Sequence, residues 1–228
     1  MKKQDFFVIL FAGLILSPFF IFDDVYAFYL KFNKEHALIT AFIKFAVLAT
    51  FGEALGLRLK EGVYNRKGFG LLPRAVVWGF LGITIKLAFD IFSTGTPYFM
   101  AHLGVENAET ALAGDFSALK LLIAFSVSFC MNVIYAPVMM TLHKITDMHI
   151  INNDGKLKAL ARKIPFADLF KSINWDVQWH FVFKKTIPFF WIPAHTVTFL
   201  LPNDFRVLFA ALLGIALGLI LAVASLKK

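Results

Sequence analysis

The stretch "KKTIPFFWIPAHTVTFLLP", residues 184–202, decides what kind of protein this chain forms. It begins with two lysines and contains three prolines and one histidine, yet most of its other side chains are aromatic or aliphatic. Such a stretch is either an unusually apolar soluble loop or a membrane helix that proline interrupts. The composition of the whole chain distinguishes the two.

The composition is that of a membrane protein. The 228 residues are 59% hydrophobic and only 17% charged, and the mean hydropathy is +0.71. Soluble domains are about 45–50% apolar and about 25% charged, so lipid must solvate much of this surface. The net charge of +8 does not indicate a nucleic-acid partner, because the basic residues are spread over several loops. We therefore expect the lipid bilayer as the main partner and no nucleic acid.

Six segments are long and apolar enough to span a bilayer, whose core of about 30 Å needs about 20 helical residues. They are 6–22, 36–57, 75–92, 118–142, 181–200 and 205–226. The alternation typical of barrel strands is absent from them. We predict an all-α fold, a polytopic transmembrane helix bundle of about six spans, as a single integral membrane domain over residues 1–228.

Of the prolines inside predicted spans, we expect three to kink their helices: Pro137, Pro188 and Pro193. A proline inside a helix removes a backbone donor and disturbs the carbonyl four residues earlier. In lipid that carbonyl needs a partner from protein or water. The opening stretch is therefore interpreted as an interrupted membrane helix that faces protein or a wet cavity.

The basic residues predict the orientation. Lysine and arginine gather in the loops 58–74 and 143–178 and at both termini, whereas the loop 93–117 has neither and carries three acidic residues. Positive charge marks the cytoplasmic side, so we expect both termini on the cytoplasmic side of the membrane. Residues 1–27 are either a retained span or a cleaved signal peptide, with the same orientation in both cases.

The segment 156–175 has an amphipathic pattern. Leu157, Leu160, Ala161 and Ile164 recur at helical spacing, with lysines on the opposite face. The pattern predicts an amphipathic helix in the membrane interface, where the basic cytoplasmic side of the protein contacts anionic lipid headgroups. The alternative is an ordinary soluble cap helix.

Small residues at helical spacing predict close helix packing. They are Gly52, Gly56, Gly79, Gly82, Ala210, Gly214, Gly218 and Ala222. In lipid, helices associate where small side chains let their backbones approach. The pattern does not decide whether the partner helix lies in the same chain or in a second copy, so both a monomer and a homo-oligomer agree with it.

Polar and ionisable residues inside or near the spans are the candidates for lining a cavity, since such groups are costly in lipid. They are Lys44, Glu53, Lys86, Asp90, Asn132, Lys184, Lys185 and His195. Lys86 and Asp90 share a helix face and are expected to pair, and Glu53 is expected to pair with Arg58 or Arg74. One hypothesis places Lys44, Lys86 and Asp90 around a polar cavity that favours anionic solutes. The alternative is that Lys86 and Asp90 form a dry pair, and that His195 is an ordinary hydrogen-bonded core histidine.

Motifs of soluble catalysis are missing from the sequence. It contains no Walker loop, no HExxH and no CxxC. His143, Asp147 and His149 lie within seven residues, but this spacing is a weak metal pattern. We expect no enzymatic activity, no cofactor and no metal.

The chain resembles the twenty-two-kilodalton peroxisomal membrane protein family, also called the Mpv-seventeen family, over roughly residues 40–226. Gly52–Glu53 matches the family's Gly-Asp pair, and Arg74 with Gly79 and Gly82 matches its arginine before a glycine-rich span. Asn132 and Ala136–Pro137 match its Asp-Gln and Ala-Pro pattern in part. Near the C-terminus, the family's Trp-Pro, Asn-Phe and Val-Pro series is matched by Trp175 or Trp179, Phe189 and Ile192–Pro193, and its following arginine by Arg206.

The chain also departs from that pattern. Phe181–Val182 stands where the family has Trp-Pro, Pro188 replaces its asparagine, and Lys86 replaces a frequent histidine. The resemblance is that of a distant bacterial member, and it implies an integral protein of the bacterial inner membrane. It implies an all-helical integral membrane protein linked to small pores or to membrane homeostasis. We thus expect a pore or transporter-like protein for ions or small metabolites; the alternative is a non-catalytic structural or scaffolding membrane protein.

Overall fold

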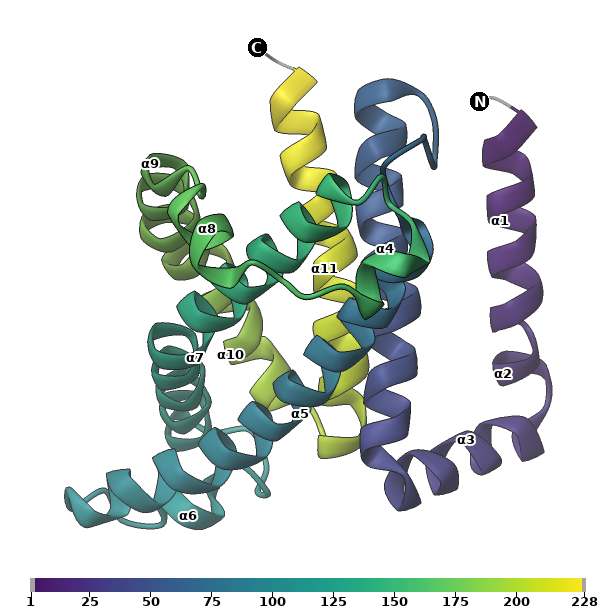
Figure 1. Cartoon of the computed structure of the whole chain (residues 1–228). Coiled ribbons are helices and arrows are strands. Elements are labelled where there is room, and N and C mark those ends of the chain that lie inside the picture. Colours follow the sequence, from purple (N-terminus) through teal and green to yellow (C-terminus); the bar gives the residue numbers. More distant parts are fainter. Residues whose placement is uncertain (1–2, 227–228) are drawn as a thin grey trace. The chain divides into compact units, whose positions relative to one another are not determined.

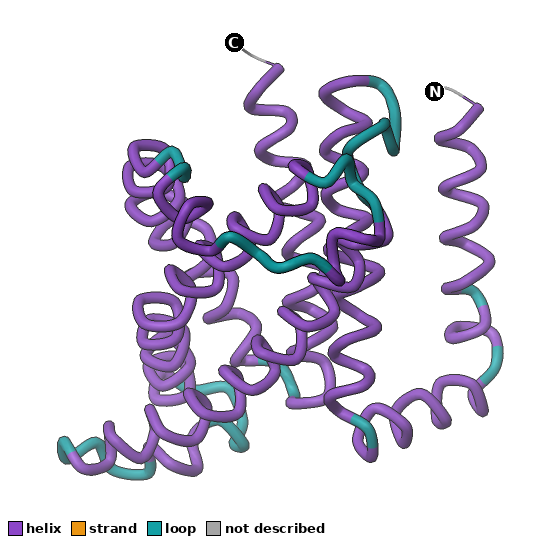
Figure 2. The backbone as a smooth tube through the Cα atoms, viewed as in Figure 1, coloured by secondary structure: helices purple, strands orange, loops and turns teal. Residues whose placement is uncertain are grey.

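The computed structural model describes residues 3–226, with side chains as far as residue 220. Most of the described residues are helical and none of them lies in a β-strand (Figure 1, Figure 2). The predicted all-α class is therefore confirmed. Residue contacts group the chain into two compact units, Met1–Thr40 and Ala41–Lys228. The single domain expected over residues 1–228 stays a prediction.

The first unit contains three helices: α1 (Lys3–Leu16), α2 (Pro18–Ile21) and α3 (Asp23–Glu35). Pro18 occupies the first turn of α2, where its missing N–H has no cost. The sequence predicted a loop at residues 23–35, and that prediction is wrong. Asp23 and Asp24 begin α3 and Lys34 lies in its last turn, so the charges complement the helix dipole at both ends.

Within residues 3–226, five helical segments are long and apolar enough to cross a membrane. They are Lys3–Ile21, Ala37–Glu61, Leu71–His102, Ala118–Asn152 and Asn203–Ile220. They correspond to five of the six predicted spans and have the lengths that an integral membrane protein requires. The helices α4 (Ala37–Glu61) and α11 (Asn203–Leu226) lie close to their predicted bounds.

Two of these helices extend well beyond the predicted spans. The third span, predicted at 75–92, is α5 (Leu71–His102), and the fourth, predicted at 118–142, is α7 (Ala118–Asn152). Hydropathy marks where a helix leaves lipid, whereas the backbone hydrogen bonds continue past that point. The expected loop between them is correspondingly short and holds one helical turn, α6 (Ala108–Ala111).

The predicted fifth span at 181–200 is not one regular helix. After a short turn, α9 (Trp175–Val177), the chain forms a π-helix, η2 (Gln178–Trp191), and then returns to α-helical geometry in α10 (Ile192–Leu200). The Ile192 amide donates to the Ile187 carbonyl, five residues earlier. Wide helical turns of this kind are rare and are frequently found at functional sites.

The prolines mark this irregular segment. Pro188 lies inside η2 and Pro193 lies in the first turn of α10, so the two prolines flank the change from π to α geometry at Ile192. Pro137 lies inside α7, which continues to Asn152. A further proline, Pro97, lies inside α5, where the sequence predicted a loop.

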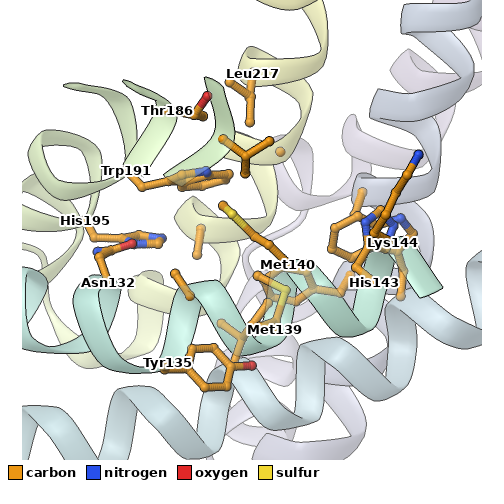
Figure 3. A pocket seen from close by; sticks show the side chains of 18 of the residues that line it. Asn132, Tyr135, Met139, Met140, His143, Lys144, Thr186, Trp191, His195 and Leu217 are labelled. Atoms are coloured by element: carbon orange, nitrogen blue, oxygen red, sulfur yellow. The ribbon is translucent and has the colours of Figure 1, made fainter. Parts of the chain in front are cut away.

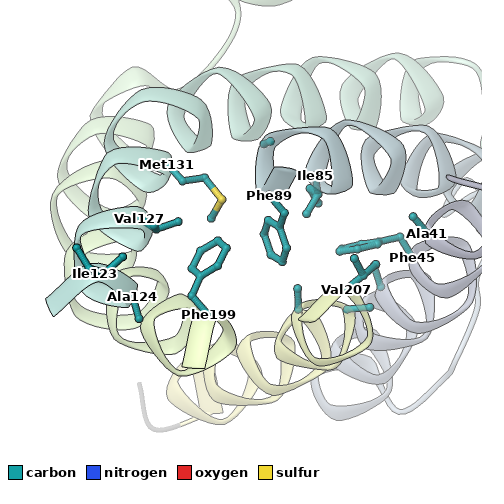
Figure 4. Close-up of a cluster of buried hydrophobic side chains, with 14 of the residues drawn as sticks. Ala41, Phe45, Ile85, Phe89, Ile123, Ala124, Val127, Met131, Phe199 and Val207 are labelled. Atoms are coloured by element: carbon teal, nitrogen blue, oxygen red, sulfur yellow. The ribbon is translucent and has the colours of Figure 1, made fainter. Parts of the chain in front are cut away.

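The second unit is built around α7, which packs against α5 on one side and against α10 on the other. The main apolar core gathers side chains from α4, α5, α6, α7, α10 and α11 (Figure 4). Phe45, Phe89 and Phe199 are its largest members, and Phe89 and Phe199 contact each other with ring centroids 5.0 Å apart. This core holds the helices around the site described below.

The small residues lie where helices cross closely. A Cβ added to Gly82 would meet the Ala41 carbonyl oxygen of α4 at 2.8 Å, and one added to Gly79 would overlap the Phe42 ring. A Cβ on Gly218 of α11 would lie 2.9 Å from the Gly52 carbonyl oxygen of α4. The described glycines of α11 therefore face α4 of the same chain. Ala222, the last residue of the predicted ridge, has its side chain outside the described residues.

The predicted interfacial helix at 156–175 is divided. It consists of a short 3-10 helix, η1 (Leu157–Ala161), an extended stretch, and α8 (Phe166–Lys171). The first helix ends at Ala161, where Arg162 is already extended, and Pro165 is the N-cap residue of α8. Leu169 packs on Ile145 near the end of α7, while Leu157 stays exposed.

A close backbone contact fixes the loops beside α7. Gly155 follows α7 and Gly70 precedes α5, both with positive φ, and a Cβ on Gly155 would lie 2.6 Å from the Gly70 nitrogen. Only glycine fits such an approach in this backbone conformation. The start of α5 and the end of α7 are thereby held together.

Candidate functional site

Two polar clusters lie along α7, one around His143 and one around Asn132. The two residues are eleven positions apart, which corresponds to about 16 Å along an α-helix. Side chains of both clusters line a cavity of about 350 Å³.

The first cluster is an ion network between α4, α5 and α7. Arg74 donates to Glu53 at 2.5 Å and also pairs with Asp147. The other oxygen of Glu53 accepts from the Trp78 indole at 3.0 Å and lies 3.1 Å from His143 Nε2. The Trp78 and His143 rings are in contact, with centroids 4.4 Å apart. The pairing of Glu53 with Arg74, predicted from the sequence, is confirmed, and both oxygens of Glu53 are occupied.

The second cluster joins α7 to α10. The Asn132 amide donates to the Ser128 carbonyl at 2.8 Å and lies 3.1 Å from His195 Nδ1. The Ser128 hydroxyl donates to the Ile192 carbonyl at 2.7 Å, at the start of α10. Trp191 stacks on the His195 ring with centroids 5.1 Å apart. Figure 3 shows His195 beside Asn132, with Trp191 over the imidazole.

The cavity lies among α4, α5, α7, η2, α10 and α11 (Figure 3). Its walls are mainly aromatic and aliphatic, with three methionines on α7: Met131, Met139 and Met140. Its polar lining residues are Glu53, Asn132, Tyr135, His143, Lys144, Gln178, Thr186 and His195. A volume of this size lies within the range of small-molecule pockets, which are mostly apolar with a few placed polar groups.

Three of the eight predicted lining residues border this cavity: Glu53, Asn132 and His195. The structure thus brings Asn132 and His195 into direct contact, and it places Glu53 in the ion network at the other polar cluster. Each of these side chains is bound by protein partners on one side and borders the cavity on another.

The five predicted lysine and aspartate positions lie elsewhere. Lys44 is buried on α4 and interacts with Asp204. Lys86 pairs with Asp90 along α5 at 2.5 Å, as predicted, but neither residue borders the cavity.

Lys184 and Lys185 are exposed on η2, and the Lys184 ammonium lies over the Trp179 ring. The cavity is therefore not the polar cavity that was hypothesised around Lys44, Lys86 and Asp90.

Two residues of the ion network, His143 and Asp147, were missed as site residues by sequence reasoning. In the sequence, His143, Asp147 and His149 form only a weak metal pattern. In the structure, His143 and Asp147 belong to the ion network. His149 lies apart from it, with its Nε2 2.9 Å from the Ala159 carbonyl. Among the described residues, no group of three or more side chains of the types that bind metals is placed to hold an ion. The spacing of His143 four residues before Asp147 was the signal for a shared helix face.

No family model matches the chain, and neither the curated proteins nor the solved structures contain a significant match to it. The resemblance to the twenty-two-kilodalton peroxisomal membrane protein family therefore stays a prediction.

Proposed function

We propose that the protein is a non-enzymatic membrane transport protein that takes a small organic molecule into the cavity beside α7. The single observation that supports this most is the cavity itself, about 350 Å³ in volume, at the place where six helical segments of the second unit converge. Of the five segments with the length and apolarity of membrane spans, four supply residues that line the cavity: α4, α5, α7 and α11.

The irregular wall of the cavity supports the same proposal. Gln178, Thr186 and Trp191 all come from the π-helix η2 and line the cavity. Backbone that departs from a regular helix is tolerated at membrane depth where it is buried in protein or borders a cavity. Interrupted helices that line a central site are also a recurrent feature of transporters.

The lining favours an organic molecule over an inorganic ion. An ion pathway must replace the hydration shell with carbonyls or charged rings. Here both oxygens of Glu53 are bound by protein donors, and methionine and aromatic side chains form much of the remaining wall. The function expected from the sequence, a pore or transporter for ions or small metabolites, is thereby narrowed to small organic solutes.

Gly214→Leu is expected to slow transport without unfolding the protein. Gly214 lines the cavity, and a Cβ there would meet only Ala49, at the ordinary contact distance of 3.9 Å, so we expect the rest of the leucine side chain to extend into the cavity. Stopped-flow swelling of proteoliposomes in glycerol, butyramide and potassium lactate measures solute entry. The wild-type protein should admit a neutral solute, and the variant should approach the protein-free rate.

Two variants serve as controls for this experiment. Gly95→Leu makes the same change on α5 at an exposed position with no atom within 4 Å of an added Cβ, and Lys86→Met removes a charge that does not border the cavity. Both should keep the wild-type rate. Wild-type protein that admits none of the three solutes would favour the structural or scaffolding alternative.

The proposed orientation has its own test. The proposal places the termini and the loops at 58–74 and 143–178 in the cytoplasm. Reporter fusions at residues 105 and 160 should then lie on opposite sides of the membrane, because α7 is the one proposed span between these two positions. An alkaline phosphatase fusion should be active at 105 and inactive at 160. Activity at both positions would remove α7 from the set of spans.

The basic loop after α7 supports a contact with anionic headgroups. Lys158, Arg162 and Lys163 are exposed there beside exposed Leu157 and Leu160. Basic and apolar side chains together are typical of segments that lie on anionic lipid surfaces. On this proposal the loop lies on the cytoplasmic leaflet.

A further inference from the structure

His195 is one of two histidines that line the cavity, and its two ring nitrogens have different surroundings. His195 is 9% exposed and lines the cavity. Its Nδ1 lies 3.1 Å from the Asn132 amide nitrogen and 3.3 Å from the Asn132 amide oxygen. No residue in the described part of the chain binds its Nε2.

The contacts of Asn132 indicate where the proton of this ring lies. The Asn132 amide nitrogen donates one hydrogen to the Ser128 carbonyl at 2.8 Å, which sets the orientation of the amide. The acceptors near its second hydrogen are His195 Nδ1 at 3.1 Å and the Ser128 hydroxyl oxygen at 3.3 Å, whereas the contact of Nδ1 with the amide oxygen is 3.3 Å long. We assign the closest of these contacts, amide N–H to Nδ1, as the hydrogen bond, and in this assignment the neutral imidazole carries its proton on Nε2.

The surroundings of this donor are apolar. Phe89 meets the His195 ring edge-on with centroids 5.7 Å apart, and Trp191 stacks on it. Met131, on the same helix as Asn132, borders the cavity beside them. A buried donor in such surroundings is stabilised by one acceptor and by little else.

We propose that the cavity binds an apolar molecule that carries a carbonyl oxygen, which accepts a hydrogen bond from His195 Nε2. Methionine side chains adapt to irregular apolar shapes, so Met131, Met139 and Met140 contact the apolar body. This proposal rests on the proposed function, since it names the class of molecule that the same cavity takes up.

A neutral carbonyl fits better than a carboxylate. Moving a carboxylate from water into an apolar cavity costs several kcal/mol unless a cation neutralises it. Among the described lining residues, Lys144 is the one lysine or arginine; it is exposed and lies twelve residues after Asn132 along α7. The donor at His195 therefore selects an uncharged acceptor.

The test compares two probes that both carry two phenyl rings. Benzophenone joins the rings through a carbonyl group, and diphenylmethane joins them through a methylene group. Equilibrium dialysis of the full chain in detergent, with protein-free micelles as the blank, gives their dissociation constants. The wild-type protein should bind the ketone about 2- to 12-fold more tightly, the range of one net hydrogen bond. Irradiation of bound benzophenone followed by peptide mass spectrometry should place the label on Met131, Met139 or Met140.

Two variants separate the donor from the shape of the site. His195→Phe keeps a ring but removes the N–H, so the two probes should bind equally. His195→Gln restores a donor in an uncharged side chain and should recover part of the preference for the ketone. If His195→Phe fails to fold, the ratio of the two probes in the wild type and in His195→Gln still tests the proposal.

The possible failures are distinguishable. Equal binding of the two probes to the wild type, or a preference for the ketone that His195→Phe retains, overturns the role of His195 while the cavity remains a binding site. Labelling outside the cavity overturns the location. If neither probe binds and none of the three solutes enters proteoliposomes, the proposed function itself fails.

Discussion

Arg74→Met is expected to destabilise the protein by about 3–5 kcal/mol, the cost of removing one partner from a buried ion pair. The Arg74 side chain is 8% exposed and binds both Glu53 and Asp147. Its Nε also donates to the Phe69 carbonyl at 2.6 Å, which holds the loop before α5. Without Arg74 two carboxylates remain between α4, α5 and α7 with no arginine to balance them.

Unfolding in mixed micelles with increasing SDS, followed by tryptophan fluorescence, measures the loss. The matched control is Arg66→Met, because Arg66 pairs with Glu61 on the surface, with 59% and 41% of the two side chains exposed. Exposed pairs contribute at most about 1 kcal/mol, so this variant should unfold near the wild-type midpoint.

A combined variant checks the physical reason. Replacing Glu53 by Gln and Asp147 by Asn together with Arg74→Met removes all three charges, and an uncharged network leaves no unbalanced carboxylate. The triple variant should therefore be more stable than Arg74→Met alone. If the triple variant loses as much free energy of unfolding as the three single variants lose together, packing and not charge explains the loss.

The long helices could be predicted from the sequence because they depend on local composition. Apolar runs gave five of the spans, and the two glycine patterns at Gly52 and Gly218 lie at a helix crossing. The ends of α5 and α7 could not be predicted in this way, since backbone hydrogen bonds continue into the polar stretches after residues 92 and 142.

The site was less predictable than the fold. Membrane charges were taken as markers of a cavity, yet Lys86 and Asp90 satisfy each other within one turn of α5. The cavity is lined instead by residues such as Trp191 and Met140, whose apolar character made them look like ordinary core. The position of Trp191 depends on the π-helical geometry of η2, which the prolines indicated only as an interruption.

The contact between α4 and α11 leads to the second large effect, at Gly218. Gly218→Ala is expected to destabilise the protein by about 1–3 kcal/mol, as overpacking of a close contact does. The added Cβ would lie 2.9 Å from the Gly52 carbonyl oxygen. This neighbour is backbone, so the two helices must separate to accept the methyl group, and close contacts elsewhere along the crossing weaken as well.

Gly214→Ala is the matched control, four residues earlier on the same helix. Its Cβ would meet Ala49 at 3.9 Å, an ordinary van der Waals distance, and alanine favours the helix over glycine by up to about 1 kcal/mol. The two substitutions are chemically identical, so unfolding by SDS should show a lower midpoint for Gly218→Ala and an unchanged or higher one for Gly214→Ala. Equal midpoints for the two variants would mean that α11 does not cross α4 at Gly218, and a lower midpoint for Gly214→Ala alone would place the closest approach one turn away.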